Sequence, residues 1–361
     1  MSQHPTPSVD HARLDTHRRT VSALVIGASG AVGRAITEEL TRTGHRFTAA
    51  SRRADDPAAR IDLGATHGLT ALSTAARQHD VVINASGIER AEIAGVLATA
   101  GTPLVDISAT GAYLHELATA SRAGARTAAP STAAPEPEPG PTVVLGAGIA
   151  PGLSTALVAD LLEKHDVSRA TAPTTGAPEI DVAVTLGAGE VHGPAALAWT
   201  AGLAGRAVYG APEPHAVQNF IERRTLPTAI GPRRFLRADF PDHVLLATPP
   251  RPGATPAIRS YLSTGSRLAT AALGLVGRVP ALRSLAARAP HIGDERWEIR
   301  AIDRATGAHR IATGSGQSRA TGIIAAHAAI AAADQPRLGA VPMSAVLRTE
   351  QLAQLPGVTV G

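Results

Sequence analysis

Three glycines near the start of the chain have the spacing of a nucleotide-binding turn. They stand at positions 27, 30 and 33 of the segment VIGASGAVGRAITEEL. In such a turn the first glycine permits a tight bend after a strand, the second lets a pyrophosphate approach the main chain, and the third lets the next helix pack closely. The N-terminus of that helix offers free amides to phosphate oxygens. We predict that the turn holds a cofactor through Gly27, Ser29, Gly30, Ala31, Val32 and Gly33.

The residues about twenty positions further on indicate which nucleotide is bound. An acidic residue at the end of the second strand binds the ribose 2′-hydroxyl of NAD. This chain instead has Ser51, Arg52 and Arg53 there. A guanidinium binds a 2′-phosphate by charge-assisted hydrogen bonds, whereas a carboxylate would repel it. We therefore predict NADP(H) as the cofactor, with two solvated surface arginines as the simpler alternative.

A third set of small residues follows a later strand, DVVINAS. An open α/β fold binds its ligand beyond the carboxyl ends of its strands. We predict that the loop of Asn84, Ala85, Ser86 and Gly87 lines the nicotinamide ribose of the cofactor. Close packing alone would also explain small side chains at this position.

Two side chains are candidates for moving the proton that accompanies a hydride. Reduction of a C=N bond needs a proton donor besides the cofactor. His192, in GEVHGPAALAW, is the first candidate, and Tyr113, just beyond the strand PLVDIS, is the second. A surface or packing role is the alternative for each, since the chain has 14 histidines and Tyr113 opens a helix.

The segment GPRRFLRAD supplies candidates for substrate binding. The alternation of a strand places Arg233 and Arg237 on one face and Arg234 on the other. Any of these guanidiniums can bind the carboxylate of a substrate that resembles an amino acid. Surface arginines paired with Asp239 or Asp242 are the alternative.

The residues that the chain lacks exclude several chemistries. There is no cysteine, which excludes disulfides, thiolate metal sites and the cysteine nucleophile of a semialdehyde dehydrogenase. Lys164 is the single lysine, so no tyrosine is followed by a lysine four positions later, as in short-chain dehydrogenases. No spacing of His, Asp and Glu resembles a metal site, and we predict none.

The order of the expected elements indicates an α/β protein with two domains. From 20 to 166, strands such as VSALVIG and RFTAAS alternate with helices, which is typical of a doubly wound parallel sheet of the Rossmann type. A Pro-rich stretch at 126–141 is expected to be a flexible loop. Residues 167–316 contain short strands mostly without crossover helices, which predicts an inserted α+β domain with an antiparallel sheet.

Charge and hydropathy argue against two kinds of partner. The formal net charge is only +4 and no long basic block is present, so we predict no nucleic-acid partner. The longest apolar runs fall short of the roughly 20 residues that span a bilayer, so we predict no membrane partner. Residues 1–19 are polar, unlike a signal peptide, and are expected to be a disordered leader. We therefore expect a cytoplasmic protein that acts on a small-molecule substrate.

Taken together, the motifs resemble the saccharopine dehydrogenase-like oxidoreductases. The segments that carry the likeness are VIGASGAVGRAITEEL, AASRR, DVVINASG, PLVDISA, GAGIAPGLSTALVADLL, FIERRTLP, GPRRFLRADFPDHVLL and SGQSRATGIIAAHAAIAA, within about 20–335. The resemblance implies an NADP-binding Rossmann domain, an inserted domain that carries the substrate pocket and a homodimer contact, and a C-terminal segment, 317–361, that packs back on the first domain. Where relatives carry a D-x-x-G-E stretch, this chain has Asp106 through Thr110 and lacks the glutamate.

These observations predict an NADPH-dependent oxidoreductase that transfers a hydride to the C=N or C=O of a small metabolite. Two alternatives stay open. An enoyl reductase acting on a lipid or polyketide chain would have an apolar tunnel in its second domain. A non-catalytic NADPH-binding sensor would need no acid/base pair.

Overall fold

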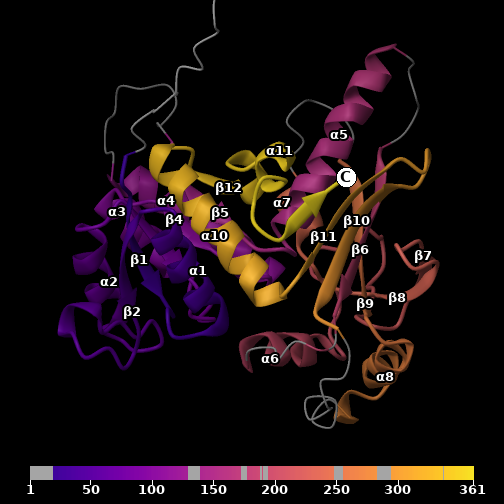
Figure 1. Cartoon of the computed structure of the whole chain (residues 1–361), viewed down its shortest axis with the longest axis horizontal. Coiled ribbons are helices and arrows are strands. Elements are labelled where there is room, and N and C mark those ends of the chain that lie inside the picture. The colour runs from indigo at the N-terminus through magenta and orange to yellow at the C-terminus, as the bar shows by residue number, and fades with distance from the viewer. Residues whose placement is uncertain are drawn as a thin grey trace, which may run out of the picture.

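The computed structural model contains two sheets with helices around them, one on each side of Figure 1. It describes residues 19–128, 139–171, 177–187, 189, 194–247, 255–282, 294–335 and 337–361. Residues 1–18 of the expected leader lie outside these ranges, as does the stretch from 129 to 138 of the expected Pro-rich loop.

The first sheet has six strands in the order β12-β5-β4-β3-β1-β2, and each neighbouring pair is parallel. The strands are β1 (Ser22–Ile26), β2 (Arg46–Ala50), β3 (Val81–Asn84), β4 (Leu104–Asp106), β5 (Val143–Leu145) and β12 (Ala340–Pro342). The middle strands β3, β4 and β5 are buried along their whole length, as is usual where helices cover both faces. The strand order reverses at β1, between β2 and β3. Ligands of open α/β sheets bind beyond the carboxyl ends of the strands at such a point.

Helices cover both faces of this sheet. They are α1 (Ala31–Arg42), α2 (Gly68–Ala76), α3 (Glu92–Ala100), α4 (Gly111–Ala128) and α10 (Gln317–Asp334). Val25 of β1 joins the core formed with α1 and α10, whereas its neighbour Leu24 joins the core formed with α2, α3 and α4. Successive strand residues point to opposite faces, so one apolar strand serves both cores. The predicted doubly wound Rossmann sheet is confirmed.

The helix α10 lies directly against α1, although the two are far apart in the sequence (Figure 1). Gly322 permits this contact, because a Cβ there would lie 2.5 Å from the Cβ of Ala35. The ring Nε2 of His327 lies 2.8 Å from Oε1 of the buried Glu39, which also accepts two hydrogen bonds from Arg42. Small residues and one buried polar contact thus hold α10 on the first domain.

The second sheet has seven strands in the order β13-β11-β10-β6-β9-β8-β7. They are β6 (Glu179–Leu186), β7 (Arg223–Leu226), β8 (Arg233–Arg237), β9 (Ala257–Thr264), β10 (Arg296–Asp303), β11 (His309–Ser315) and β13 (Val358–Val360). Its described pairs are antiparallel except β6 with β9, which are parallel. The predicted second domain with an antiparallel sheet is therefore confirmed, with one parallel pair at its centre.

The core of the second sheet is built around Trp297 on β10, which is 2% exposed. It stands opposite Gly314 on β11, where an added Cβ would lie 2.3 Å from the indole ring. The helices α5 (Leu153–Thr171), α6 (Pro194–Leu203) and α8 (Arg267–Arg278) surround this sheet. The pairing of an indole with a glycine lets a large ring lie flat on the sheet.

Short elements complete the described chain. They are η1 (Pro57–Ala59), α7 (Asp242–Leu245), η2 (Pro280–Leu282), η3 (Met343–Ala345) and α11 (Thr349–Leu352). The segment HVLLATP has the composition of a strand, but α7 occupies its start, because its carbonyls and amides bond locally from Pro241 onward. None of the described helices combines the length and apolar character required to cross a bilayer.

Candidate nucleotide site and the groups around it

The glycine turn after β1 fits tightly against the loop after β3. Gly27 has a φ of 83°, and a Cβ there would lie 2.5 Å from the carbonyl oxygen of Ala85. A Cβ on Gly33 would lie 2.2 Å from the carbonyl oxygen of Gly27. At Gly30, by contrast, the nearest atom to such a Cβ is the Gly27 oxygen at 3.3 Å. The first and third glycines are required for packing, whereas the space over the second is limited only by this one close contact.

The start of α1 presents main-chain amides to that space. Gly30 precedes the helix in an extended conformation and no side chain caps it. The amides of Ala31, Val32 and Gly33 belong to the first helical turn, which has no acceptor within its own helix. Arg34 donates a hydrogen bond to the carbonyl oxygen of Ser29 and so braces the turn. These amides, with the partial positive charge of the helix, suit a phosphate.

The turn after β2 is joined directly to the glycine turn. The amide of Gly27 donates to the carbonyl oxygen of Ala50 at 2.9 Å. Beyond Ala50 the chain bends, and the amide of Arg53 donates to Oγ of Ser51 at 3.3 Å. The side chains of Arg52 and Arg53 are exposed, and neither guanidinium has a hydrogen-bond or ion-pair partner within the described ranges. Both are available to an anion beside the glycine turn.

A short loop supports these two arginines. The sequence did not reveal this loop. Arg60 donates from Nε to the carbonyl oxygen of Ala54 at 3.0 Å, and its main chain forms a bridge with Ser51. Oδ1 of Asp56 accepts a hydrogen bond from the amide of Ala58 at 2.9 Å. Local hydrogen bonds therefore fix the shape of the loop and leave the two guanidiniums outside.

The loop after β3 is shaped by Asn84, which is 1% exposed. Its amide nitrogen donates to Oδ2 of Asp106 at 2.8 Å, and its oxygen accepts from Oγ of Ser86 at 2.7 Å. Gly87 has a φ of 73° and is exposed. Asn84 is buried and holds the loop by its hydrogen bonds, whereas Ser86 and Gly87 form the accessible part of the loop.

Tyr113 is buried and only 4% exposed. Its hydroxyl donates to Oδ2 of Asp106 at 2.8 Å. Burial raises the pKa of the Tyr113 phenol, and the carboxylates of Asp106 and Glu89 raise it further. Burial also raises the pKa of Asp106, against hydrogen bonds from Ser108, Asn84 and Tyr113. This placement favours a positioning role for Tyr113, because the phenol holds its proton firmly.

Glu89 is a second carboxylate at this edge that the sequence-based prediction missed. Partial burial and the nearby carboxylate of Asp106 raise the pKa of Glu89. The sequence feature that could have identified Glu89 is its position two residues beyond Gly87, in the loop that follows a predicted strand.

The three arginines predicted to bind substrate lie on β8, apart from this edge. Arg237 is fully buried: it donates to the carbonyl oxygen of Ser260 at 3.1 Å and pairs with Glu213 at 3.4 Å. Arg234 is exposed and Arg233 half-buried. The structure does not bring the three together with the glycine turn. His192, the first candidate proton donor, lies outside the described residues.

A polar contact joins the second domain to the start of α4. The ring Nδ1 of His115 lies 2.8 Å from the hydroxyl of Tyr209. Two further contacts hold the main chain of Tyr209. Its amide donates to Oδ2 of Asp239 at 3.0 Å, and its carbonyl oxygen lies 2.6 Å from Nε2 of His243. These bonds set the position of the loop around Tyr209 relative to the first sheet.

A buried carboxylate, Asp242, fixes α5 to the second sheet. It accepts hydrogen bonds from Oγ of Ser154 at 2.6 Å and Oγ1 of Thr155 at 2.8 Å, and from Ser260 at 3.3 Å. Burial raises the pKa of Asp242, and these hydrogen bonds oppose the rise. The three hydroxyl donors compensate for burying the carboxylate.

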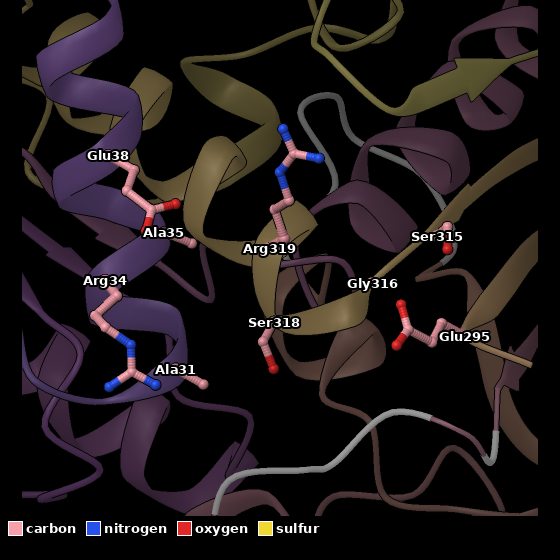
Figure 2. Close-up of a pocket in the computed structure, with 9 residues that line it drawn as sticks. All are labelled: Ala31, Arg34, Ala35, Glu38, Glu295, Ser315, Gly316, Ser318 and Arg319. Carbon is pink, nitrogen blue, oxygen red and sulfur yellow. The ribbon is translucent and has the colours of Figure 1, made fainter. Parts of the chain in front are cut away.

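A pocket of about 400 Å³ lies between α1 and the start of α10 (Figure 2). Its lining residues are Ala31, Arg34, Ala35, Glu38, Glu295, Ser315, Gly316, Ser318 and Arg319. Figure 2 shows the α1 side chains on one side, Glu295 on the other and the first turn of α10 between them. With two guanidinium and two carboxylate groups, the lining suits a polar ligand. Within the described ranges, no group of three or more His, Asp or Glu residues is arranged to hold a metal ion.

Solved structures similar to this chain are dehydrogenases and reductases. A mutant of meso-dapdh from Clostridium tetani E88 shares 11% identity over 93% of this chain and 97% of that one, with a TM-score of 0.43. Dihydrodipicolinate reductase from Paenisporosarcina sp. TG-14 shares 12% identity over 91% of this chain and 100% of that one, with a TM-score of 0.39. An oxidoreductase from Sinorhizobium meliloti shares 10% identity over 88% of this chain and 89% of that one, with a TM-score of 0.37.

A sequence-family model also matches the chain, whereas a search of curated protein sequences found no match. Residues 23–141 match the model of the NAD dependent epimerase/dehydratase family. That range contains the glycine turn, the arginine turn and the loop after β3, and it supports the predicted NAD(P)-dependent oxidoreductase in its coarse form. The first domain of the chain is thus of the NAD(P)-binding Rossmann type.

Proposed function

We propose that this protein is an NADPH-dependent oxidoreductase of the saccharopine dehydrogenase-like kind, which transfers a hydride to the C=N or C=O of a small metabolite. The observation that carries the proposal is the hydrogen bond from Gly27 to Ala50. It joins the glycine turn to the turn after β2 that carries Arg52 and Arg53, whose guanidiniums have no partner within the described ranges.

The residues present fit such a cofactor. The absence of a side chain at Gly30 and the first-turn amides of α1 suit a pyrophosphate. Arg52 and Arg53 suit the 2′-phosphate that distinguishes NADPH from NADH. Ser86 and Gly87 are accessible beside the turn and suit the nicotinamide ribose. When bound there, the cofactor supplies a hydride from its nicotinamide ring.

The chain's own residues orient the ligand and exclude competing contacts. Asp106 holds Asn84 and Tyr113 in fixed positions, and Asn84 in turn shapes the loop that faces the ribose. Neither Asn84 nor Tyr113 is exposed, so both act by holding the loop. A preformed loop needs no rearrangement when the ligand arrives, which favours binding.

The charged pocket between α1 and α10 favours a small polar substrate over a long apolar one. Its lining carries Arg34, Arg319, Glu38 and Glu295. The enoyl-reductase alternative requires an apolar tunnel, which this lining does not supply. His192 stays in the proposal as candidate proton donor, and Arg233 and Arg234 of β8 stay as candidate substrate ligands, whereas Arg237 is fully buried against Glu213. A homodimer and a cytoplasmic location also stay predictions.

Cofactor titration tests the proposed function. NADPH and NADH are titrated separately into the full chain, and dissociation constants are measured by nucleotide fluorescence and by calorimetry. We expect NADPH to bind at least tenfold more tightly than NADH, since one charge-assisted hydrogen bond contributes about 1.5 kcal/mol or more. Equal affinities would overturn the NADPH assignment, and absence of binding would overturn the function. Stopped-flow oxidation of bound NADPH by a panel of imines and aldehydes separates an enzyme from a sensor.

A further inference from the structure

One side of the helix α8 is apolar and faces solvent. Leu268 is 83% exposed, Leu275 is 52% exposed, and Val279, which follows the last turn, is 42% exposed. These positions repeat at helical spacing, so the three side chains form one stripe of the helix with the exposed Ala271 and Ala272. Figure 1 shows α8 at an outer edge of the second domain, away from the first sheet.

The stripe gathers side chains of a kind that is elsewhere scattered. Seven large apolar side chains are exposed in the part of the chain that the structure describes, and three of them belong to this stripe. Single exposed apolar residues are common on protein surfaces, whereas a group of them on one surface indicates a site of interaction.

Packing on the opposite side holds α8 in place. The buried residues of the helix are Thr270, Gly274, Val276 and Gly277. A Cβ added to Gly277 would lie 2.7 Å from Cβ of Phe220, so the helix lies close against the segment before β7. Oγ of Ser266 caps the first turn by accepting a hydrogen bond from the amide of Ala269 at 3.3 Å. The exposed stripe is therefore available to a partner.

The stripe lies in a strongly basic part of the chain. Between Asp242 and Asp294 the sequence has six arginines and no Asp or Glu. Two of these arginines, Arg267 and Arg278, stand at the two ends of α8 and are exposed. Arg267 has no hydrogen-bond or ion-pair partner within the described ranges, and Arg278 donates to the carbonyl oxygen of Gly274 at 3.0 Å. Positive charge thus flanks the apolar stripe at both ends.

These charges disfavour a second copy of the chain as the occupant. The helix carries no acidic residue, so two copies of α8 packed along the stripe would place arginine against arginine at both ends, in either relative direction. Like charges repel most strongly where apolar contact excludes water. The stripe also has no aromatic or Met side chain, the kinds in which protein interfaces are enriched. The phosphates of a lipid surface, by contrast, are complementary to both arginines.

We propose that this face of α8 docks on an anionic lipid bilayer. The apolar stripe enters the boundary between headgroups and acyl chains, and Arg267 and Arg278 contact lipid phosphates from its two ends. The sequence predicts no membrane partner because no apolar run can span a bilayer, whereas a helix that lies on the surface does not have to span it. The inference is independent of the proposed function.

Sedimentation with lipid vesicles tests the proposal. The full chain is mixed with sucrose-loaded vesicles of phosphatidylcholine, either alone or with about one-third phosphatidylglycerol, in about 0.1 M salt. We expect the partition coefficient to be at least about tenfold higher for the anionic vesicles, because each arginine near a charged surface adds to binding. Raising the salt to about 0.5 M should remove most of this difference by screening.

Two double variants separate the apolar and the charged contributions. Leu268→Ser with Leu275→Ser keeps the net charge, and we expect it to lower the partition coefficient at least about tenfold, because less apolar area is buried in the lipid. Arg267→Gln with Arg278→Gln should weaken binding to the anionic vesicles and leave binding to the neutral vesicles unchanged.

Matched controls change the same kinds of side chain elsewhere. Ile230→Ser alters an apolar side chain that is 74% exposed on the loop between β7 and β8. Arg77→Gln with Arg122→Gln removes two exposed arginines from the first domain. Both controls should bind vesicles as the unaltered protein does. Thermal melting of each variant checks that the fold is intact, as expected for exposed side chains.

A fluorophore at position 268 reports whether the stripe enters the lipid. The chain has no cysteine, so Leu268→Cys creates a single site for a polarity-sensitive dye. Its emission should move to shorter wavelength on anionic vesicles, whereas the same dye on Ile230→Cys should not respond.

Three outcomes would overturn the proposal. The first is absence of binding to anionic vesicles. The second is undiminished binding by the variant with Leu268→Ser and Leu275→Ser, which would assign the affinity to net charge alone. The third is an emission shift without vesicles that grows with protein concentration, together with a doubled mass in light scattering. That result would make the stripe an interface between two copies of the chain.

Discussion

The main-chain amide of Gly27 and the carbonyl oxygen of Ala50 lie 2.9 Å apart and form a hydrogen bond. The bond joins the turn after β1 to the turn after β2. The glycine turn and the turn that carries the two free guanidiniums are therefore joined directly, although more than twenty residues separate Gly27 from Arg52 in the sequence.

Replacing both Arg52 and Arg53 with alanine should weaken NADPH binding by about 10²-fold or more. Each guanidinium is expected to contribute hydrogen bonds to the 2′-phosphate, and such bonds to charged groups contribute about 1.5–3 kcal/mol each. NADH lacks this phosphate, so its affinity should change less than twofold. Arg77→Ala, at an exposed arginine in the same domain, is the control. Equal losses for both nucleotides would contradict the assignment.

Gly30→Ala and Gly33→Ala should fail in different ways. At Gly30 the added methyl would meet one atom, the Gly27 carbonyl oxygen at 3.3 Å, so the variant should fold with a small loss of stability but lose nucleotide affinity at least tenfold. At Gly33 the methyl would lie 2.2 Å from a main-chain oxygen, which should destabilise the fold by about 3 kcal/mol. Chemical denaturation and nucleotide titration separate the two. Gly95→Ala, on α3 with open space around it, is the control.

Tyr113→Phe should lower the free energy of unfolding by about 1–2 kcal/mol, because Asp106 loses one buried hydrogen bond. Turnover should fall less than tenfold if the phenol only positions its neighbours. Since the pKa of Tyr113 is raised, its ionisation should not appear in a pH–rate profile below pH 10. A loss of 10²-fold or more in turnover, with folding intact, would make Tyr113 the proton donor instead.

Glu39→Gln should flatten the acid side of the stability profile. Burial raises the pKa of Glu39, but the hydrogen bonds from Arg42 and His327 outweigh it, so the pKa lies below the ordinary 4.5. A lowered pKa stabilises the fold above pH 4.5, and this contribution is lost as the pH falls through the folded-state value. Thermal melting between pH 3 and 6 measures it. Glu38→Gln, the exposed neighbour, should leave the profile unchanged.

Asp242→Ala should destabilise the chain by about 3 kcal/mol, because Ser154, Thr155 and Ser260 would be left without their shared acceptor. Denaturant unfolding of the full chain measures the loss. Asp334→Ala, at an exposed aspartate, should stay within about 0.5 kcal/mol of the unaltered protein. A similarly small effect at Asp242 would show that this buried cluster does not hold α5 on the second sheet.

The sequence by itself determined the parts that depend on local geometry. No other residue fits at Gly27 or Gly33, because main-chain atoms fill the space where a Cβ would stand. The spacing of these glycines therefore predicted the turn. The alternation of buried strands and helices likewise predicted the parallel sheet. These features depend on neighbours within a few residues, and their pattern is therefore visible in one dimension.

Only the tertiary structure decided which distant residues meet. Nothing in the sequence joins Asn84 to Asp106, or Asp242 to Ser154, because these contacts depend on how strands are ordered in a sheet and how the two sheets are packed. Arg237 is of a residue type that can bind a substrate carboxylate, yet it is fully buried against Glu213. The burial of a charged side chain is set by what the fold places over it, and residue type alone does not fix that.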